Sequence, residues 1–485
     1  MADSPILFDA DIAVIGAGGA GLYSALCAAR QGARVVLVSA TPLAQTASYW
    51  AQGGIAAALA DDDSPDQHRA DTEKAGRGMV RDSAATVLCR EAPHVVADLE
   101  RLGVRFDVDA DGRLSLGLEG GHSKRRVAHA GGSATGRRIV RQLSAVAVED
   151  ERITVLEGAR AATLSLHEGR CVGVVCEDGR AIRARATVIA TGGAAALWSR
   201  TTNPPGSIGI GMLLAQAAGA ALADLEFVQF HPTAVTGVPG REGFLVTEAI
   251  RGEGATLLDR DGERFVEELE PRDVVSRAVF NTMTREGSSH VRLDMRGVDP
   301  GRFPNIINAL RESGLDPMTE LVPVSPAVHY VMGGIVADLD GQTTVPGLYA
   351  CGESSCTGLH GANRLASNSL SECFVWGARA ATAGLTEPRV ASGSVPGPPT
   401  PIPVPSRETR EALWRHAGIE RTPEGLTELL EDPHPLARTV ARCALMRQES
   451  RGAHFRVDFP ETDPALDDQH AVVQPGAAPA FARWS

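Results

Sequence analysis

The sequence predicts an α/β protein built on a Rossmann-like dinucleotide-binding domain, with an inserted α+β domain and a small C-terminal helical domain. A strand, a glycine-rich turn and a helix open the chain. Between residues 225 and 330, mixed loops, more charges and isolated histidines interrupt the apolar runs, and a proline-rich stretch precedes the last helical patterns. The predicted ranges are 1–224 and 331–392 for the dinucleotide-binding domain, 225–330 for the insertion, 393–406 for a linker, and 407–485 for the helical domain with an extended tail.

Composition and charge narrow the class of protein. Of the 485 residues, 43% are hydrophobic and 22% are charged, as in an ordinary globular protein. The formal net charge of −13 disfavours nucleic acid as a partner, because phosphate binding needs a basic face. We find no apolar run of 18 or more residues and no export signal at the start, so we expect a cytoplasmic protein without a membrane partner.

Cysteine and lysine usage give two further expectations. The eight cysteines are scattered without C-x-x-C pairs, so we expect free thiols and no metal site. Lys74 and Lys124 are the only lysines, and arginine supplies nearly all the positive charge. A single arginine is therefore weak evidence of function and has to be judged by its neighbours.

The chain opens with a βαβ unit. "DIAVI" is a buried strand, "LYSALCAARQG" has the apolar spacing of a helix, and "ARVVLVS" is a second strand. Between the first strand and the helix, Gly16, Gly18 and Gly21 form G-x-G-x-x-G, which lets a pyrophosphate approach the helix N-terminus. The acidic residue that usually ends the second strand of a nicotinamide site is absent, because Ser39 and Ala40 stand there.

Further glycine-rich segments follow along the chain. In "YWAQGGIAAAL", Gln52-Gly53-Gly54 suits backbone lying against a flat ring, or simply a turn into a buried strand. "ATVIATGG" is a strand that enters a glycine turn, and "PGSIGIGMLLAQAAGA" is a glycine-rich helix start. Glu353 directly follows the strand of "VPGLYACGESS", where a carboxylate can accept a ligand hydroxyl, and "GANRLASNSL" opens a helix whose first N–H groups can stabilise negative charge.

Together these segments resemble the flavoprotein family of L-aspartate oxidase, succinate dehydrogenase flavoprotein and fumarate reductase. The matching stretches span residues 9–380 in family order: "GAGGAG", "AQGG", "ATGG", "FVQFHPT", "LVTEAIRGEG", "PRDVVSRA", "HYVMGG" and "LYACGE…GLHGANRLASNSL". "RQESRGAHFRVDFP" resembles the family's C-terminal domain. The resemblance implies that the Rossmann-like domain binds FAD, that the insertion is a capping domain, and that the active site lies between them. The implied cofactor-binding residues are Gly16, Ala17, Gly18, Gly19, Ala20, Gly21, Ser39, Ser48, Ala51, Gln52, Gly53, Gly54, Glu353, Ser369 and Leu370.

The resemblance also implies hydride transfer between a C4 dicarboxylate and the flavin. A dicarboxylate needs fixed donors at both ends, and Arg364 in "GANRL" can bind a carboxylate through two hydrogen bonds. His231 in "FHPT" and His329 in "VHYVMGG" can donate to carboxylate oxygens, with Thr247 and Gln229 as additional substrate-binding residues. A lone histidine is more often structural, so these assignments depend on the motifs that contain them.

A proton-transfer chain is implied in the same way. Arg272 in "PRDVV" matches the family's catalytic arginine, and "TEAIR" supplies Glu248 and Arg251 at i and i+3, on one face if the segment is helical. The family uses such an Arg–Glu–Arg chain to move protons. The alternative is an ion-pair network with a purely structural role.

Two features separate the members of the family. Succinate dehydrogenases and many fumarate reductases attach FAD covalently through a histidine five residues before the glutamine of "AQGG". In this sequence that position is Ala47, so we expect non-covalent FAD. The quinone-linked enzymes are usually longer and dock an iron–sulfur subunit, whereas this chain is short.

A third feature lies in "LEGGHSKRR". Where the quinone-linked enzymes resemble Phe-Gly-Gly-Gln, this chain has Glu119-Gly120-Gly121-His122. A carboxylate would repel succinate, but it would attract the α-ammonium group of L-aspartate, and burying it without a cation would be unfavourable. Glu119 is therefore expected to bind the amine of an amino-acid substrate; the plainer alternative is a solvated turn.

The expected reaction is oxidation of L-aspartate to iminoaspartate, with the flavin reoxidised by O2, giving hydrogen peroxide, or by fumarate. In the family this is the first step of de novo NAD biosynthesis, and it hands iminoaspartate to quinolinate synthase. A soluble fumarate reductase is the enzymatic alternative, and a non-catalytic flavin-binding subunit is the other. One departure supports the latter, because Ile210 stands in "SIGIGM" where the family generally has aspartate.

Overall fold

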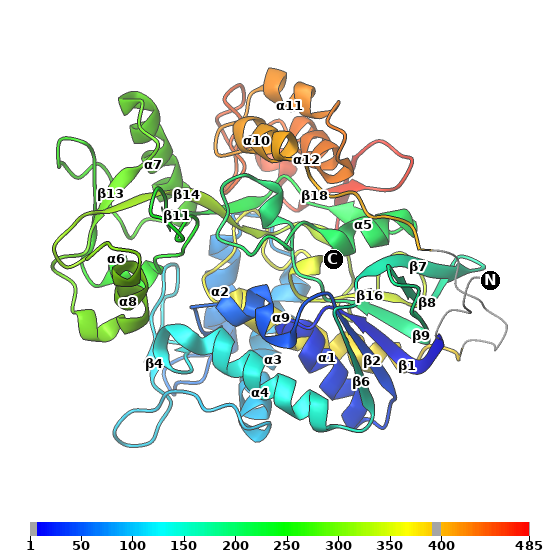
Figure 1. The fold of residues 1–485 in the computed structure, drawn as a ribbon. Helices are drawn as coiled ribbons and strands as arrows, with labels where there is room; N and C mark the ends of the chain where they lie inside the picture. Colours follow the sequence, from blue (N-terminus) through cyan, green and yellow to red (C-terminus); the bar gives the residue numbers. More distant parts are fainter. Residues whose placement is uncertain (1–6, 390–398, 485) are drawn as a thin grey trace.

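The computed structural model describes residues 7–389 and 399–484. Residues 393–398 of the predicted linker lie outside this range. Within the described ranges, the structure contains no helix with the length and apolar character needed to span a membrane. Figure 1 shows a twisted sheet at the right, a separate green lobe at the left, and the C-terminal helices above.

The largest sheet has seven strands and is the core of the dinucleotide-binding domain. β1, β2, β6, β9 and β16 pair in parallel, and β7 and β8 form an antiparallel extension beside β9. The parallel strands are apolar runs because helices cover them on the faces. The strands are β1 Leu7–Ile15, β2 Val35–Ser39, β6 Ile153–Glu157, β7 Ala161–His167, β8 Arg170–Cys176, β9 Ala181–Ile189 and β16 Leu348–Ala350.

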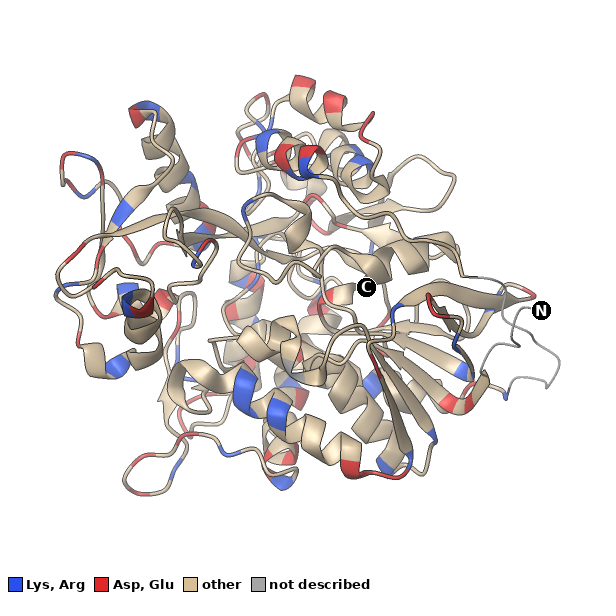
Figure 2. Ribbon diagram, in the orientation of Figure 1, with Lys and Arg blue, Asp and Glu red and all other residues tan. Residues whose placement is uncertain are grey.

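Four long helices accompany this sheet. α1 packs against α9 and α4, and α3 packs against α9. In Figure 2 the strands of the large sheet carry little charge along their length, whereas blue and red segments alternate over the outer helices and loops. The helices of this domain are α1 Gly19–Arg30, α2 Pro65–Ala75, α3 Asp82–Arg101, α4 Thr135–Glu149, α5 Ile210–Ala217 and α9 Asn368–Gly384.

The green lobe of Figure 1 is the inserted domain. It is a four-stranded antiparallel sheet in the order β11-β14-β13-β12, with its own apolar core. Its elements are β11 Val228–Val235, α6 Glu248–Gly252, β12 Thr256–Leu258, α7 Arg272–Glu286, β13 Val291–Asp294, α8 Pro304–Glu312 and β14 Val322–Val331. An α+β insertion between two parts of a Rossmann-like domain is the predicted fold class, which is confirmed; the boundaries 225 and 330 stay predictions.

Two small sheets complete the molecule. One has three strands: β3 Ile55–Ala56, β4 Leu116–Gly117 and β5 Val127–Ala128. The other has five: β10 Leu222–Ala223, β15 Gly334–Val336, β17 Ser355–Cys356, β18 Gln469–Val473 and β19 Ala480–Arg483. β4 and β5 frame the loop that contains Glu119, and β18 ties the end of the chain to β10.

The C-terminal region is helical as expected, with α10 Arg407–His416, α11 Pro423–Leu429 and α12 Pro435–Met446. The sequence predicts only an extended tail at the end of the range 407–485, yet β18 and β19 lie there. The polar and proline-rich sequence of these residues does not predict strands. β18 is stabilised by pairing with β10, which is far away in the sequence, and local sequence patterns do not reveal such pairing.

Candidate active site

The glycine-rich turn between β1 and α1 provides a close-fitting anion site. Gly16 has φ of 108°, and a Cβ atom there would overlap Ala190 O, while a Cβ on Gly21 would overlap Gly16 O. No side chain caps α1 at Gly18, and the hydroxyl of Ser48 accepts the Gly19 N–H at 3.1 Å. The bare backbone and the helix N-terminus fit the pyrophosphate of FAD.

Glu353 lies where it can form a hydrogen bond with a hydroxyl group of the cofactor. A Cβ on Gly193 would overlap its carboxylate, and the Val331 N–H donates to Oε1 at 3.1 Å. Burial raises the pKa of Glu353 to about 8, so at neutral pH this side chain both donates and accepts hydrogen bonds. That capacity suits the ribityl chain of FAD.

The loop after Trp50 brings further expected cofactor residues together. Gln52 donates to Leu245 O at 3.1 Å, while its buried Oε1 atom has no partner among the described residues. Such an orphaned acceptor fits a polar edge of a bound ring. The Gly54 N–H donates to Ser367 Oγ at 3.2 Å, which joins this loop to the start of α9.

The remaining expected cofactor residues divide into two groups. Ser369 accepts a 3.3 Å hydrogen bond from Arg364 Nη1. Ser39 turns back and donates to Thr41 O at 2.6 Å. Residues placed by their elements alone are Ala17 and Ala20 in the glycine turn, Ala51 and Gly53 beside Gln52, and Leu370 in the first turn of α9.

Ile210 starts α5 and packs against the main apolar core. Its side chain therefore contributes to packing instead of providing the polar contact that aspartate gives in the family. The preceding residue, Gly209, has φ of 73°, a left-handed conformation that glycine favours, so the turn into the helix is kept.

Two guanidinium groups, that of the buried Arg364 and that of the partly buried Arg272, share one amide oxygen. Arg364 Nη2 and Arg272 Nη1 donate to Gln229 Oε1 at 2.9 and 3.1 Å. The amide nitrogen of Gln229 is fixed in turn by Asn363 Oδ1 at 2.8 Å and Arg364 O at 2.9 Å. Burial and then the nearby Arg272 lower the pKa of Arg364 to about 10, and Arg364 itself has no direct ion pair with a carboxylate among the described residues.

Glu248 links Arg272 to Arg251. Its Oε2 atom accepts from Arg272 Nε at 2.7 Å and lies 3.6 Å from Arg251 Nη2. Burial alone would raise the pKa of Glu248, but Arg272 and Arg251 outweigh it, so the pKa is lowered and the carboxylate stays ionised. Arg272 is the first residue of α7, where the helix dipole disfavours a cation, so this position is unusual for an arginine without a function.

The two expected histidines face each other, with ring centroids 5.4 Å apart. Burial, followed by repulsion from Arg272, lowers the pKa of both His231 and His329 well below the usual range, so both rings are neutral. The Thr233 N–H donates to His231 Nδ1 at 3.3 Å, which leaves the ring proton on Nε2 as a donor. Thr247 directly precedes α6, and its side chain makes no capping hydrogen bond to the helix.

Glu119 lies in the β4–β5 loop with its side chain 11% exposed. Ser367 Oγ donates to its Oε2 atom at 2.6 Å, and its Oε1 atom lies 3.8 Å from His129 Nε2. No ion pair with an arginine occurs at Glu119 in the described part of the chain. This enclosed carboxylate is not the solvated turn that the plainer alternative predicts.

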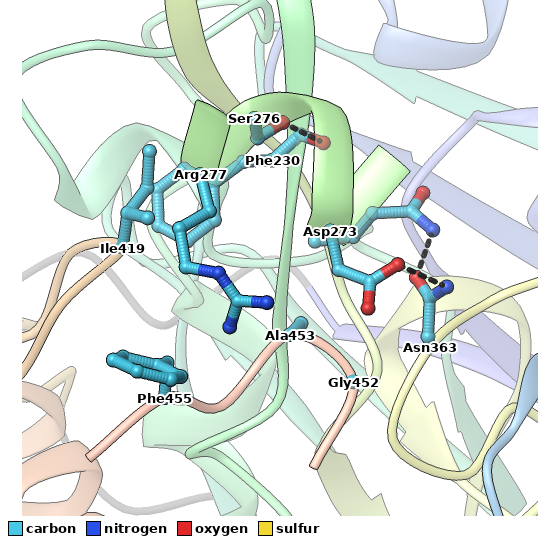
Figure 3. Close-up of a pocket in the computed structure, with 10 residues that line it drawn as sticks. Phe230, Asp273, Ser276, Arg277, Asn363, Ile419, Gly452, Ala453 and Phe455 are labelled. Atoms are coloured by element: carbon cyan, nitrogen blue, oxygen red, sulfur yellow. Dashed lines mark hydrogen bonds between the residues drawn. The ribbon is translucent and has the colours of Figure 1, made fainter. Parts of the chain in front are cut away.

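A narrow cleft adjoins the arginine pair on the side of the C-terminal region (Figure 3). Gln229 and Asn363 belong to both the cleft and the arginine cluster. Asn363 Nδ2 donates to Asp273 Oδ1 at 3.5 Å on one side of the cleft, and Arg277 lies 4.5 Å from the ring centroid of Phe455 on the other. The cleft separates α7 from the C-terminal segment and is lined by both charge signs, which does not suit a dianion.

Several contacts of the site were missed from sequence. Ser367 donates a hydrogen bond to Glu119, His129 Nε2 lies 3.8 Å from the same carboxylate, and the guanidinium of Arg364 lies 4.5 Å from the ring centroid of Tyr330. Ser367 and Tyr330 carried a signal, since they lie within the quoted motifs "GANRLASNSL" and "HYVMGG". All eight cysteines are free, and no group of three or more potential metal ligands occurs among the described residues.

Comparison with known proteins agrees with this geometry. Residues 11–370 match the FAD binding domain family, and residues 430–479 match the fumarate reductase flavoprotein C-terminal family. The chain is 44% identical to an L-aspartate oxidase of Agrobacterium fabrum, over 93% of this chain and 91% of that protein. An L-aspartate oxidase of Mesorhizobium japonicum is 45% identical, over 93% of this chain and 92% of that protein.

The chain belongs to the L-aspartate oxidase family of FAD-binding flavoproteins.

A solved quinol-fumarate reductase with menaquinol molecules has the same fold as this family member, with a TM-score of 0.88 and 29% identity over 99% of this chain and 98% of that chain. The protein is therefore an FAD-dependent oxidoreductase, and the prediction of FAD as its cofactor is confirmed. Sequence alone had predicted this family from short motifs, and the match extends the resemblance to nearly the whole chain.

Proposed function

We propose that the protein oxidises L-aspartate to iminoaspartate. The observation that carries this proposal is Glu119, an enclosed carboxylate that makes no direct ion pair with an arginine within the described ranges, in a loop close enough for its charge to act on Arg364. The relatives that share the family carry the name L-aspartate oxidase. The α-ammonium group of L-aspartate would form an ion pair with Glu119. The two substrate carboxylates would form ion pairs with Arg364 and Arg272.

Each end of the substrate then has fixed partners. Arg364 binds one carboxylate: its guanidinium carbon lies 4.5 Å from the ring centroid of Tyr330, and its buried Nε atom has no partner among the described residues. His231 and His329, being neutral, donate hydrogen bonds without adding charge. Thr247 is an additional donor beside Glu248. When both carboxylates and the amine are bound at once, the Cα–H bond points in one fixed direction. This orientation lowers the activation barrier of hydride transfer.

Proton removal falls to the Arg272–Glu248–Arg251 chain. Arg272 faces the substrate and Glu248 keeps it oriented through a 2.7 Å ion pair. Arg251 lies on the far side of Glu248, with its Nη1 atom bonded to Glu268 O, so the chain leads away from the site. An arginine side chain is hard to deprotonate, so it acts as a base only with assistance. The neighbouring ionised carboxylate provides that assistance.

When bound, FAD would supply the acceptor for the α-hydrogen, transferred as hydride, and the two electrons would go on to O2, giving hydrogen peroxide, or to fumarate. The product, iminoaspartate, would feed quinolinate synthase in the first step of de novo NAD biosynthesis, and we place the reaction in the cytoplasm. These assignments of acceptor, partner and compartment follow from the proposed activity.

Two alternatives use the same residues differently. A soluble fumarate reductase would use the arginine pair and the relay but gives Glu119 no role, since its substrate has no amine. A non-catalytic flavin-binding subunit is favoured only by Ile210, whose packing in the core is compatible with an active enzyme.

Anaerobic reduction of the flavin separates the three functions. We expect L-aspartate to bleach the visible absorbance of the oxidised, FAD-loaded protein, because hydride leaves the α-carbon for the flavin. Bleaching by succinate but not by L-aspartate would identify the fumarate reductase alternative. A yellow protein that neither compound reduces would identify the non-catalytic one.

The amine-binding role of Glu119 is tested by Glu119→Gln, which keeps the shape and removes the charge. Losing a charge-assisted hydrogen bond is worth about 1.5–3 kcal/mol, so the KM for L-aspartate should rise roughly tenfold to a hundredfold. Fumarate reduction by the same variant should change far less, because fumarate has no amine. Equal effects on both substrates would remove the amine-binding role.

The attachment of FAD is tested by denaturation. Because Ala47 stands where the covalently flavinylated relatives have histidine, acid precipitation should release all the flavin into the supernatant. The supernatant absorbance and the residual colour of the pellet measure the two fractions. Flavin that stays with the washed pellet would show a covalent bond to another residue.

A further inference from the structure

Gly120 brings bare backbone against the proton-transfer chain. A Cβ atom at this position would overlap Oε1 of Glu248 and lie 3.0 Å from its Cδ atom. Gly120 belongs to the β4–β5 loop of the dinucleotide-binding domain, whereas Glu248 starts α6 in the inserted domain. The contact therefore joins the two domains at the carboxylate of the relay.

The loop that carries Gly120 cannot retreat easily. The His122 N–H donates to Glu119 O at 3.2 Å and closes the turn. On one side of Gly120, Ser367 holds Glu119, and on the other, His122 Nε2 is hydrogen-bonded to Ala366 O at 2.8 Å. Both anchors lie on adjacent residues before α9, so the turn is fixed on a single rigid support.

Glu248 is constrained from the opposite direction. Its Oε2 atom is held by Arg272 and lies near Arg251, while its Oε1 atom faces Gly120. A side chain on residue 120 would have to push this carboxylate away, and the 2.7 Å ion pair with Arg272 would lengthen. Gly120 does not have a positive φ, so alanine would add bulk there without straining the backbone.

We propose that Gly120 is a positioning residue for proton transfer, whose missing side chain sets the place of Glu248 between Arg272 and Arg251. This proposal rests on the proposed oxidation of L-aspartate. It adds a dependence of proton transfer on Gly120, which the activity alone does not require. Gly120, the residue next to Glu119, then aligns the Arg272–Glu248–Arg251 chain. The same fixed turn therefore supports both amine recognition and proton removal.

The test is Gly120→Ala in the FAD-loaded protein. General acid–base catalysis is worth roughly 10²- to 10⁴-fold, so we expect kcat for L-aspartate to fall about a hundredfold, with a larger solvent isotope effect. Flavin content and the dissociation constant for succinate should stay within about twofold. The matched control is Leu118→Ala, the other neighbour of Glu119, whose side chain is 50% exposed and which should behave as the wild type.

A second comparison separates positioning from general damage to the loop. In a Glu248→Asp background the shorter side chain withdraws from Gly120, so adding Gly120→Ala should lower kcat by less than about threefold further. Fully multiplicative effects, or a Gly120→Ala enzyme with wild-type kcat, would overturn the proposal. A wild-type protein that does not oxidise L-aspartate would instead refute the proposed function, and the two failures are distinguishable.

Discussion

A buried arginine and a partly buried one, which share one glutamine oxygen, are the constraint on which the rest of the structure depends. Arg364 and Arg272 both donate to Gln229 Oε1, and like charges held together away from water are unfavourable unless an anion compensates them. Glu248 compensates Arg272 in part, through a single ion pair. The cluster is therefore prepared for a ligand with two negative groups, and the lowered pKa of Arg364 is the sign of that incomplete pairing.

Holding this cluster requires segments that lie far apart in the sequence. Gln229 comes from β11, Arg272 from the start of α7, and Arg364 from the loop before α9. The Rossmann-like domain supplies the glycine turn and the loop, and the inserted domain supplies the relay. Gly120 and the cleft of Figure 3 lie where these parts meet, so the site depends on how the inserted domain sits against its host.

The features that could be predicted from sequence are those encoded locally. Gly16, Gly18 and Gly21 stand at fixed spacing in one βαβ unit, and Glu248 and Arg251 share a short helix. Resemblance to the family extended this to Arg272 and Arg364, whose motifs are distinctive. The fold class followed from the same segments because strand and helix periodicity is a local property.

The rest could not be predicted because it depends on contacts between distant residues. Ser367 holds Glu119 across 248 positions, and His129 approaches it from the residue that follows β5. β18 pairs with β10 from a distant part of the chain as well as with its neighbour β19. The partly buried side chain of Ile210 packs against the main apolar core, a contact that its glycine-rich motif does not encode. The contact between Gly120 and Glu248 likewise has no sequence signature, because a glycine in a turn has many possible reasons.

The most direct measurement is a structure of the FAD-loaded protein with 2-methylaspartate, which keeps both carboxylates and the amine but has no α-hydrogen to lose. The account predicts one carboxylate on Arg364, the other beside Arg272, and the ammonium nitrogen within hydrogen-bonding distance of Glu119. A bound analogue whose nitrogen points elsewhere, with Glu119 turned into bulk solvent, would contradict it.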